Sequence, residues 1–322
     1  MNKDIFCRGF SWGFNSRPGD YMTQEARETM KRLASDGCDW ICITVNNYMD
    51  TYHSLLIHPV YGRTQTDEDV VYAIRMAKDM GLKVCLKPMV DCLDGVWRAH
   101  VSFPMDVMTF WDKWFESYTA FMCHYARIAE INGCEMLCTG CEMAGMDAVA
   151  DHCRKMIEKV RGIYHGKLMH NINHGDELDF EWLSDVDVIG ISAYYAVTDG
   201  EHVSAGDMKK GWAGVMKTVE ACHRKYQRPV MFAEIGMRSE HGCSAYPFDY
   251  RPKAEKGLSL EEQSDFYRTA MEATWELPWF AGYFWWDQVA VYRWPYDPKT
   301  DVGFGIFGKP AEETLKEFYL TK

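Results

Sequence analysis

Two glutamates are the first candidates for chemistry, because each closes a short apolar run typical of a buried strand. Glu142 lies near the end of CEMLCTGCEM, and Glu234 lies near the end of RPVMFAEIG. Residues at the carboxyl ends of parallel barrel strands carry the chemistry of such folds. Cleavage of a glycosidic bond requires one carboxylic acid and one carboxylate that face each other across the sugar. The pair is therefore typical of a two-carboxylate glycosidase.

The apolar periods alternate between strand and helix along the whole chain, without a linker, a repeat or a low-complexity segment. The strand-like runs are IFCRGFSW, DWICITVNN, LKVCLKPMVD, CEMLCTGCEM, KLMHNIN, DVIGISAYY, PVMFAEIG and FAGYFWWD. Helices are expected at residues 24–35, from 66 onward, and at 110–131, 151–164, 181–184, 208–226, after 259 and 312–319. Ser259 and Glu262 have the spacing of a capping box. Eight strands alternating with helices predict a single (β/α)8 barrel domain over residues 1–322.

Side-chain alternation orients the two carboxylates. In the expected strands Glu234 shares a face with Phe232, and Glu142 shares a face with Met136 and Cys138. If those faces look into the barrel, both glutamates meet over its mouth.

Composition narrows the class of partner. The chain has 322 residues, a formal net charge of −12 and 14% aromatic residues, including 12 Trp and 18 Tyr. A phosphate backbone requires a basic stripe, which the sequence lacks, so we expect no nucleic-acid partner. No apolar run approaches the roughly 18 residues that span a bilayer, so we expect no membrane partner. Flat aromatic faces suit sugar binding, although large aromatic side chains also fill cores.

Twelve cysteines are irregularly spaced, and most fall within expected strands and helices. This pattern is typical of reduced, buried thiols and not of a secreted disulfide framework. The amino-terminal MNKDIFCRGFSWGF has no basic region followed by an apolar stretch and a cleavage site. We therefore expect a cytoplasmic protein without an export signal.

Several segments, in the same order, resemble glycoside hydrolase family 113, whose members are retaining (β/α)8 glycosidases. They run from KPMVD to FAGYFWWD and include CEMLCTGCEM, KVRGIYHGKL, DVDVIGISAYY, AEIGMRS and SDFYRTAMEA. The resemblance covers most of the chain. It implies hydrolysis of β-1,4-mannan or manno-oligosaccharides with net retention, so the expected partner is a neutral β-linked oligosaccharide or polysaccharide, with no metal and no organic cofactor.

The resemblance assigns Glu142 as the acid/base and Glu234 as the nucleophile. Tyr194 or Tyr195 matches the tyrosine that hydrogen-bonds the nucleophile. In a retaining mechanism Glu234 must stay ionised, whereas the pKa of Glu142 must be raised, first by an apolar pocket and then by the charge of its partner. Besides the tyrosines, candidate donors to Glu234 are Arg8 and Arg238.

Trp285 or Trp286 matches the tryptophan that forms the floor beneath the sugar. Consecutive strand residues face opposite ways, so one of them faces the sugar and the other packs against helices. Trp286 is favoured because it shares a face with Gly282 and Phe284. Other candidate substrate-binding residues are Trp12, Asn46, Lys87, Trp97, Arg98 and Asn173.

Two positions depart from the family pattern. Cys141 stands before the acid/base, where the family has Thr and many related glycosidases have Asn. A thiol is the poorer hydrogen-bond donor, so contact with the sugar 2-hydroxyl would come from elsewhere. Ala196 replaces the proline that often follows the strand-six tyrosines.

The sharpest alternative is a radical S-adenosylmethionine enzyme, because Cys134, Cys138 and Cys141 have the C-x3-C-x2-C spacing of its iron–sulfur ligands. Against it, alternation places Cys138 and Cys141 on opposite strand faces. Gly140 also stands where that motif usually has an aromatic residue.

A metal-dependent barrel hydrolase is a second alternative, because His170, His174 and Asp176 cluster after the fifth strand. No HxH on the first strand completes a ligand set. A non-catalytic carbohydrate-binding barrel is a third, but both glutamates are present. Within the glycosidase class, the alternative to hydrolysis of mannan is a related β-glycosidase or xylanase-type activity on other β-linked oligosaccharides.

Overall fold

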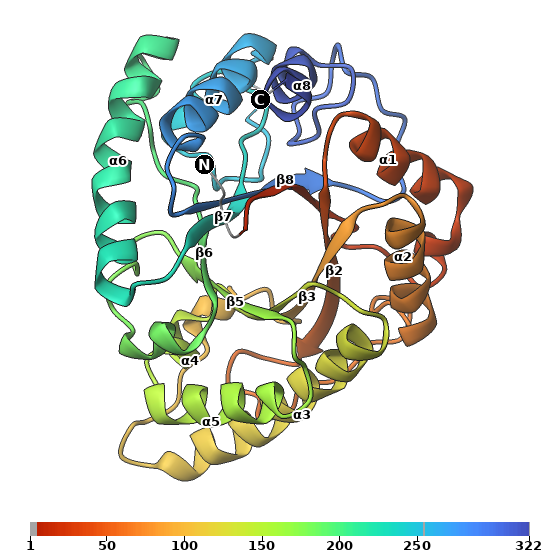
Figure 1. The fold of residues 1–322 in the computed structure, drawn as a ribbon, viewed down its shortest axis with the longest axis vertical. Coiled ribbons are helices and arrows are strands. Elements are labelled where there is room, and N and C mark those ends of the chain that lie inside the picture. Colours follow the sequence, from red (N-terminus) through yellow and green to blue (C-terminus); the bar gives the residue numbers. More distant parts are fainter. Residues whose placement is uncertain (1–4, 254, 322) are drawn as a thin grey trace.

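The computed structural model describes residues 5–253 and 255–321, and its centre is a closed ring of eight parallel strands. Each strand pairs with the next, and β8 returns to β1. Figure 1 shows the strands around the centre with helices outside them. The strands are β1 (Cys7–Trp12), β2 (Trp40–Met49), β3 (Lys83–Cys92), β4 (Met136–Cys141), β5 (Lys167–Asn173), β6 (Val188–Ser192), β7 (Val230–Ile235) and β8 (Phe280–Gln288). The predicted (β/α)8 barrel is confirmed.

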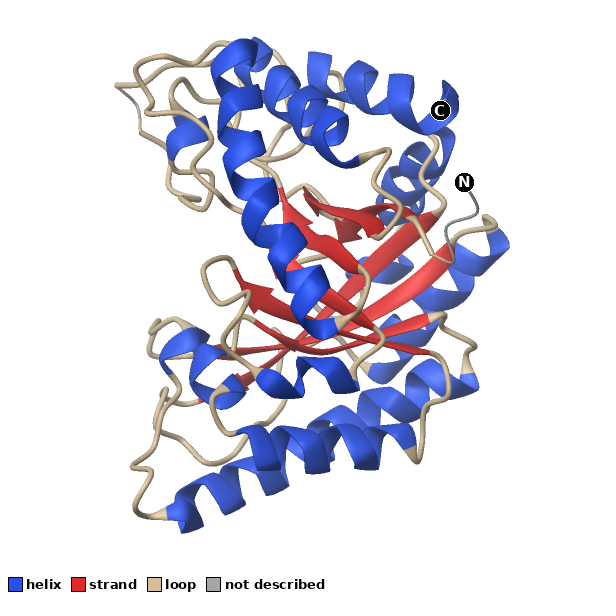
Figure 2. Ribbon diagram, turned by 60° about the vertical axis from the view of Figure 1, so that its left-hand side comes forward, coloured by secondary structure: helices blue, strands red, loops and turns tan. Residues whose placement is uncertain are grey.

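Helices alternate with the strands and form the outer layer, which Figure 2 shows in side view. They are α1 (Gln24–Ser35), α2 (Asp67–Asp79), α3 (Met108–Ile131), α4 (Ala144–Asp147), α5 (Ala150–Arg161), α6 (Ala205–Tyr226), α7 (Leu260–Thr274) and α8 (Pro310–Thr321). Short 3-10 helices lie between them at η1 (Asp20–Met22), η2 (Arg98–His100), η3 (Glu181–Asp185) and η4 (Cys243–Ala245). The one-turn helix α4 was not expected from the sequence. Among the described residues, no helix combines the length and apolarity needed to cross a membrane.

Local sequence explains one helix start and misleads at another. Thr66 and Asp69 form a capping box that opens α2, since each side chain accepts a hydrogen bond from the backbone N–H of the other. The capping box expected at Ser259 and Glu262 is wrong, because the Ser259 side chain makes no capping hydrogen bond. The Glu262 carboxylate instead accepts from the backbone N–H of Gly242 at 2.8 Å, and so fixes the loop after β7.

The barrel wall separates two apolar clusters, one inside the ring and one between the ring and the helices. Sulfur-containing side chains are prominent in the inner cluster, which consists of Cys7, Trp40, Cys42, Cys85, Met136, Cys138, Met169, Val188, Met231, Ala233, Ala281 and Phe284. Such side chains fill irregular space without demanding strong hydrogen bonds. On β3 the buried Lys87 follows Cys85 by two residues, so the polar site begins where this apolar filling ends.

Irregular strand pairing changes the predicted faces. Phe232 packs outside the barrel on Trp212 of α6, whereas Met231 and Ala233 lie inside, so Glu234 does not share the face of Phe232 as alternation predicted. The pairing of β6 with β7 shifts register at this point. The irregularity turns Glu234 inward.

Strand β4 carries a similar irregularity. Cys138 pairs with Met169 of β5, and Cys141 pairs with Asn171, so three steps on β4 match two steps on β5. This bulge breaks the strict alternation on which the predicted faces of β4 depend. Glu142 still reaches the mouth of the barrel, but by way of the bulge and not by simple alternation from Cys138.

Candidate active site

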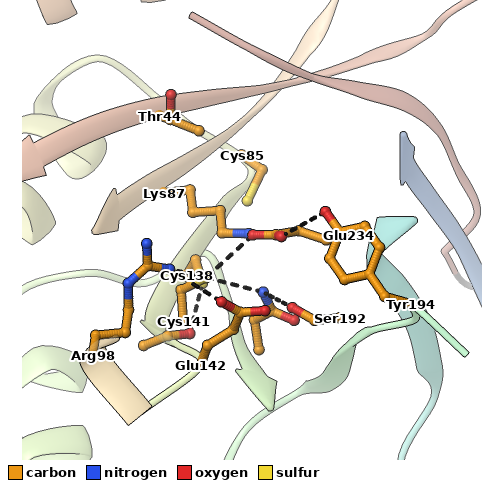
Figure 3. Close-up of polar contacts among 12 residues, drawn as sticks. Thr44, Cys85, Lys87, Arg98, Cys138, Cys141, Glu142, Ser192, Tyr194 and Glu234 are labelled. Carbon is orange, nitrogen blue, oxygen red and sulfur yellow. Dashed lines mark hydrogen bonds and ion pairs between the residues drawn. The ribbon is translucent and has the colours of Figure 1, made fainter. Parts of the chain in front are cut away.

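Glu234 lies buried at the end of β7, where three donors from other strands and loops surround its carboxylate. The Lys87 ammonium lies 2.5 Å from Oε1. The Cys141 thiol donates to the same oxygen at 3.2 Å, and the Tyr194 hydroxyl donates to Oε2 at 3.0 Å. Figure 3 shows these groups converging on the carboxylate. Both oxygens of Glu234 are therefore held in a fixed orientation.

The same donors keep Glu234 ionised. Burial alone would raise the pKa of this carboxyl, but the charge and hydrogen bond of Lys87, with smaller contributions from Arg98 and Cys141, together outweigh burial, and the pKa is lowered. Burial, reinforced by the charge of Glu234, raises the pKa of Tyr194 and of Cys141. Both groups thus keep their protons and remain donors.

Glu142 follows β4 in an unusual backbone conformation. Its φ of 55° lies in the left-handed region, which costs energy for residues other than glycine and is concentrated at functional sites. Its N–H donates to the carbonyl oxygen of Asn171 at 2.9 Å. On the side chain, Oε2 accepts from Arg98 Nη1 and from Trp97 Nε1, each at 3.3 Å. The loop between β3 and α3 therefore positions this carboxyl.

The protonation preference of Glu142 is opposite to that of Glu234. Burial and then the negative charge of Glu234 raise the pKa of Glu142, while Arg98 and Lys87 oppose the rise only in part. The two neighbouring carboxyls thus favour different forms, one protonated and one ionised. This is the electrostatic division that acid and nucleophile require.

Trp286, and not Trp285, lies beside these carboxyls. The half-buried Trp286 ring lies 4.7 Å from the ring of Phe14, and Lys87 Nζ lies 5.8 Å from its centroid. Trp285 is fully buried and stacks on Tyr267 of α7, with ring centroids 3.8 Å apart. The flat face at the mouth of the barrel therefore belongs to Trp286.

Two predicted substrate-binding residues lie outside this group. Trp12 is fully buried in the outer cluster, where its Nε1 donates to Thr29 Oγ1 at 3.1 Å, so the expectation of sugar contact does not fit its position. Trp12 is the last residue of β1, and its side chain packs toward the helices and not toward the mouth of the barrel. Tyr195 donates to the Glu177 carboxylate and not to Glu234, so Tyr194 alone of the pair contacts the expected nucleophile.

Asn46 lies within β2 and Asn173 ends β5, and both bond to aspartates. Asn46 Nδ2 donates to Asp91 Oδ2 at 2.9 Å, and Asn173 Nδ2 donates to Asp176 Oδ2 at 3.4 Å. By contrast, Lys87, Trp97 and Arg98 contact the two glutamates directly, as the distances above show.

Arg8 and Arg238, which the sequence suggests as donors to Glu234, pair with other carboxylates. Arg8 pairs with Asp39 at 3.2 Å, and Arg238 pairs with Glu240 in the loop after β7. The cation beside Glu234 is Lys87, for which the sequence predicts contact with the sugar.

The three cysteines of the radical-enzyme alternative do not converge. Alternation was wrong for one pair, because the bulge in β4 leaves Cys138 in the inner cluster and directs Cys141 at Glu234. Cys134, however, precedes β4 and packs in the outer cluster. In residues 5–253 and 255–321, no three His, Cys, Asp or Glu side chains are grouped as metal ligands. The donor geometry thus gives the cluster no support.

His170 of β5 and His174, which follows β5, bond to different partners. His170 is fully buried, and its Nε2 lies 2.9 Å from Oδ1 of Asp147 at the end of α4. His174 Nδ1 lies 3.1 Å from the carbonyl oxygen of Ser192. His170 therefore ties the turn that follows Glu142 to β5, which is a structural role.

Four residues of the site were not identified as such from the sequence. They are Cys141 as a donor to Glu234, Asp91 beside Arg98, Asn171 behind Cys141 and Asp287 after Trp286. Burial, then the charge of Glu234, raises the pKa of Asp287 to about 7. Asp91 and Asp287 each lie one residue before the end of an apolar strand, and that position is the signal that could have revealed them.

Two carboxyls of opposite protonation preference at the mouth of a (β/α)8 barrel, beside a tryptophan face, define the protein as a glycoside hydrolase. The sequence model of Glycoside Hydrolase Family 113 matches residues 10–309. The chain belongs to this family.

Solved structures agree with this assignment. A structure described as a complex of a GH113 β-1,4-mannanase is 32% identical, with a TM-score of 0.89, and the match covers 99% of this chain and 100% of that one. The GH113 β-mannanase AaManA from Alicyclobacillus acidocaldarius, in complex with ManMIm, is also 32% identical, with a TM-score of 0.88 and coverage of 98% and 97%. A family 5 mannosidase from Rhizomucor miehei shares the fold at 11% identity and a TM-score of 0.66, with coverage of 99% and 93%. No curated protein sequence matches the chain.

Proposed function

We propose that this glycoside hydrolase cleaves β-1,4-mannosidic linkages in mannan or manno-oligosaccharides with retention, with Glu234 as nucleophile and Glu142 as acid/base. The observation that carries the assignment of roles is the contact of Lys87 with Glu234, because it keeps one carboxyl ionised while the other favours its proton. Membership of the family, and the β-1,4-mannanase activity named for its structural neighbours, support the choice of substrate.

In the first step Glu234 attacks the anomeric carbon, and the bond between that carbon and the leaving oxygen breaks. Glu142 gives its proton to the leaving oxygen, so the released sugar departs as an alcohol. Trp286 provides an apolar face for the ring of the sugar that is attacked.

In the second step the roles of the charges reverse. The ester formed on Glu234 is neutral, so the repulsion that raised the pKa of Glu142 is gone. Glu142 is then ionised and takes a proton from water as the water attacks the anomeric carbon. The bond to Glu234 breaks, and the free sugar is released with its original anomeric configuration.

The roles are tested with an activated aryl β-mannobioside and azide. Glu142→Ala should still form the glycosyl-enzyme from this substrate, and azide should restore turnover and give a β-glycosyl azide. Glu234→Ala should lose turnover of every substrate. Glu177→Gln, which alters a carboxylate bonded to Tyr195, serves as the control and should keep its activity on manno-oligosaccharides within about tenfold. Normal turnover by Glu234→Ala, or an α-glycosyl azide, would refute the assignment.

The substrate is tested with β-1,4-linked manno-, gluco- and xylo-oligosaccharides of defined length. Internal cleavage of the manno series, with much lower kcat/KM on the other two, is the expected result. Preference for the gluco or xylo series would favour the alternative of a related β-glycosidase. A cytoplasmic location stays a prediction, and it is supported by all twelve cysteines being free thiols.

A further inference from the structure

The guanidinium of Arg98 is shared between two carboxylates. Its Nη2 and Nε lie 2.6 and 3.1 Å from Asp91 Oδ1, while its Nη1 lies 3.3 Å from Glu142 Oε2. Arg98 is only 7% exposed, so solvent does little to screen its charge. The shorter pair of contacts goes to Asp91.

Asp91 is itself fixed from the other side. It lies on β3, four residues beyond Lys87, and its Oδ2 accepts from Asn46 Nδ2 of the neighbouring strand at 2.9 Å. One oxygen thus holds Arg98 and the other is held by Asn46. This arrangement places a negative charge on the far side of the guanidinium from Glu142.

The charged and titratable groups that face Glu142 come from five parts of the barrel. They are Lys87 of β3, Cys141 of β4, Tyr194 after β6, Glu234 of β7 and Arg98 of η2. Of the two cations, Lys87 is paired with Glu234 and Arg98 is paired with Asp91. Those four charges cancel without any charge on Glu142.

We propose that Asp91 is a positioning residue for acid catalysis: by holding Arg98, it limits how far that cation stabilises the carboxylate form of Glu142, which therefore keeps its proton. The inference rests on the proposed role of Glu142 and adds the residue that sets its charge balance. Asp91 acts through Arg98 and does not need to touch the substrate.

The direction of the effect follows from electrostatics. With Asp91 neutralised, Arg98 has an uncompensated positive charge 3.3 Å from Glu142, which favours the carboxylate. The pKa of Glu142 then falls. With Arg98 neutralised instead, the carboxylate loses its nearest cation, and the pKa of Glu142 rises.

The experiment is a titration of Glu142 that needs no substrate. In protein labelled with 13C at the glutamate carboxyls, the Glu142 signal is assigned by its loss in Glu142→Gln, and its chemical shift is followed with pH. Asp91→Asn should move the titration to lower pH, and Arg98→Gln should move it to higher pH. Asp94→Asn is the matched control, since Asp94 lies three residues after Asp91 but accepts from the backbone N–H of Val96 at 3.0 Å, and it should not move the titration of Glu142.

A kinetic measurement tests the consequence for the reaction. The alkaline limb of kcat/KM on a manno-oligosaccharide reports the acid of the free enzyme, so it should move to lower pH in Asp91→Asn. On that limb the variant should lose roughly threefold or more in kcat/KM, which corresponds to about half a pH unit. The leaving group of 2,4-dinitrophenyl β-mannobioside needs no proton. With this substrate the alkaline limb of kcat/KM should be the same in Asp91→Asn and in the native protein.

The possible failures are separable. An unmoved Glu142 titration in folded Asp91→Asn, or shifts of the same sign in Asp91→Asn and Arg98→Gln, would overturn the inference whatever the activity. General loss of structure cannot mimic shifts of opposite sign. If the titrations move as expected but the protein hydrolyses no manno-oligosaccharide, the charge balance stands and the proposed function fails.

Discussion

Replacing Lys87 by Met tests whether this one cation keeps the nucleophile ionised. Methionine preserves most of the length of the side chain and removes its charge. Lys87 is fully buried, and the Glu234 side chain is 5% exposed, so water cannot take the place of the ammonium. A buried carboxylate without a cation becomes protonated instead of staying charged.

The magnitude follows from the cost of that protonation. For an unperturbed glutamate pKa near 4.3, about 1.36 kcal/mol per unit gives a limit of ~3.7 kcal/mol at pH 7 and ~1 kcal/mol at pH 5. In the native protein the lowered pKa of Glu234 gives stability that is present above the unfolded pKa and is lost as pH falls through the folded pKa. In Lys87→Met the folded pKa is raised instead, so the folded state is increasingly destabilised as pH rises from the unfolded pKa toward the folded pKa. The destabilisation should therefore be larger at pH 7 than at pH 5.

Urea unfolding at the two pH values measures this difference. We expect Lys87→Met to lose up to ~2.7 kcal/mol more in the free energy of unfolding at pH 7 than at pH 5, which is the difference between the two limits. The exposed Lys83 opens the same strand, and Lys83→Met should change the free energy by less than about 0.5 kcal/mol at either pH. Turnover by Lys87→Met at pH 7 should fall at least ~100-fold, because the protonated carboxyl is a poor nucleophile. Equal destabilisation at both pH values, with turnover near that of the native protein, would refute the reasoning.

Trp285→Ala should lose about 3–5 kcal/mol of stability, because its ring is buried against Tyr267. Trp286→Ala should mainly lower kcat and kcat/KM. If the two variants lose the same stability and keep the same kcat/KM, β8 is not part of the active site. Cys141→Ser should keep kcat within about threefold, since a hydroxyl can also donate to Glu234, while Cys141→Val should lower it further by removing the donor. Higher activity in the Val variant than in the Ser variant would show that this hydrogen bond is unimportant.

Local sequence was sufficient for the fold and for the identity of the two carboxyls. The apolar run KLMHNIN gave β5 its observed bounds, and the periodicity over residues 24–35 gave those of α1. Both depend on contacts between near neighbours in the chain, so the pattern is visible in one sequence. Alternation also predicted that Trp286 lies on the face of Phe284, and the structure places Trp286 at the mouth of the barrel while Trp285 is buried against α7.

Pairing between distant segments decided what the sequence could not. The bulge between Cys138 and Cys141 is a property of two strands together, since it is defined by the register against Met169 and Asn171. It reversed the expected face of Cys141 and made that thiol a donor to Glu234. A one-strand rule cannot contain this information.

Charge partners were decided in the same way. Arg238 lies four residues from Glu234 in the chain, yet the ammonium that reaches the carboxylate is that of Lys87, which is 147 residues away. Arg98, in turn, divides its guanidinium between Asp91 and Glu142. The sequence determined that two carboxyls would end two barrel strands. The closed barrel determined which of them faces an unshared cation, because only ring closure brings β3 and β7 to opposite sides of one mouth.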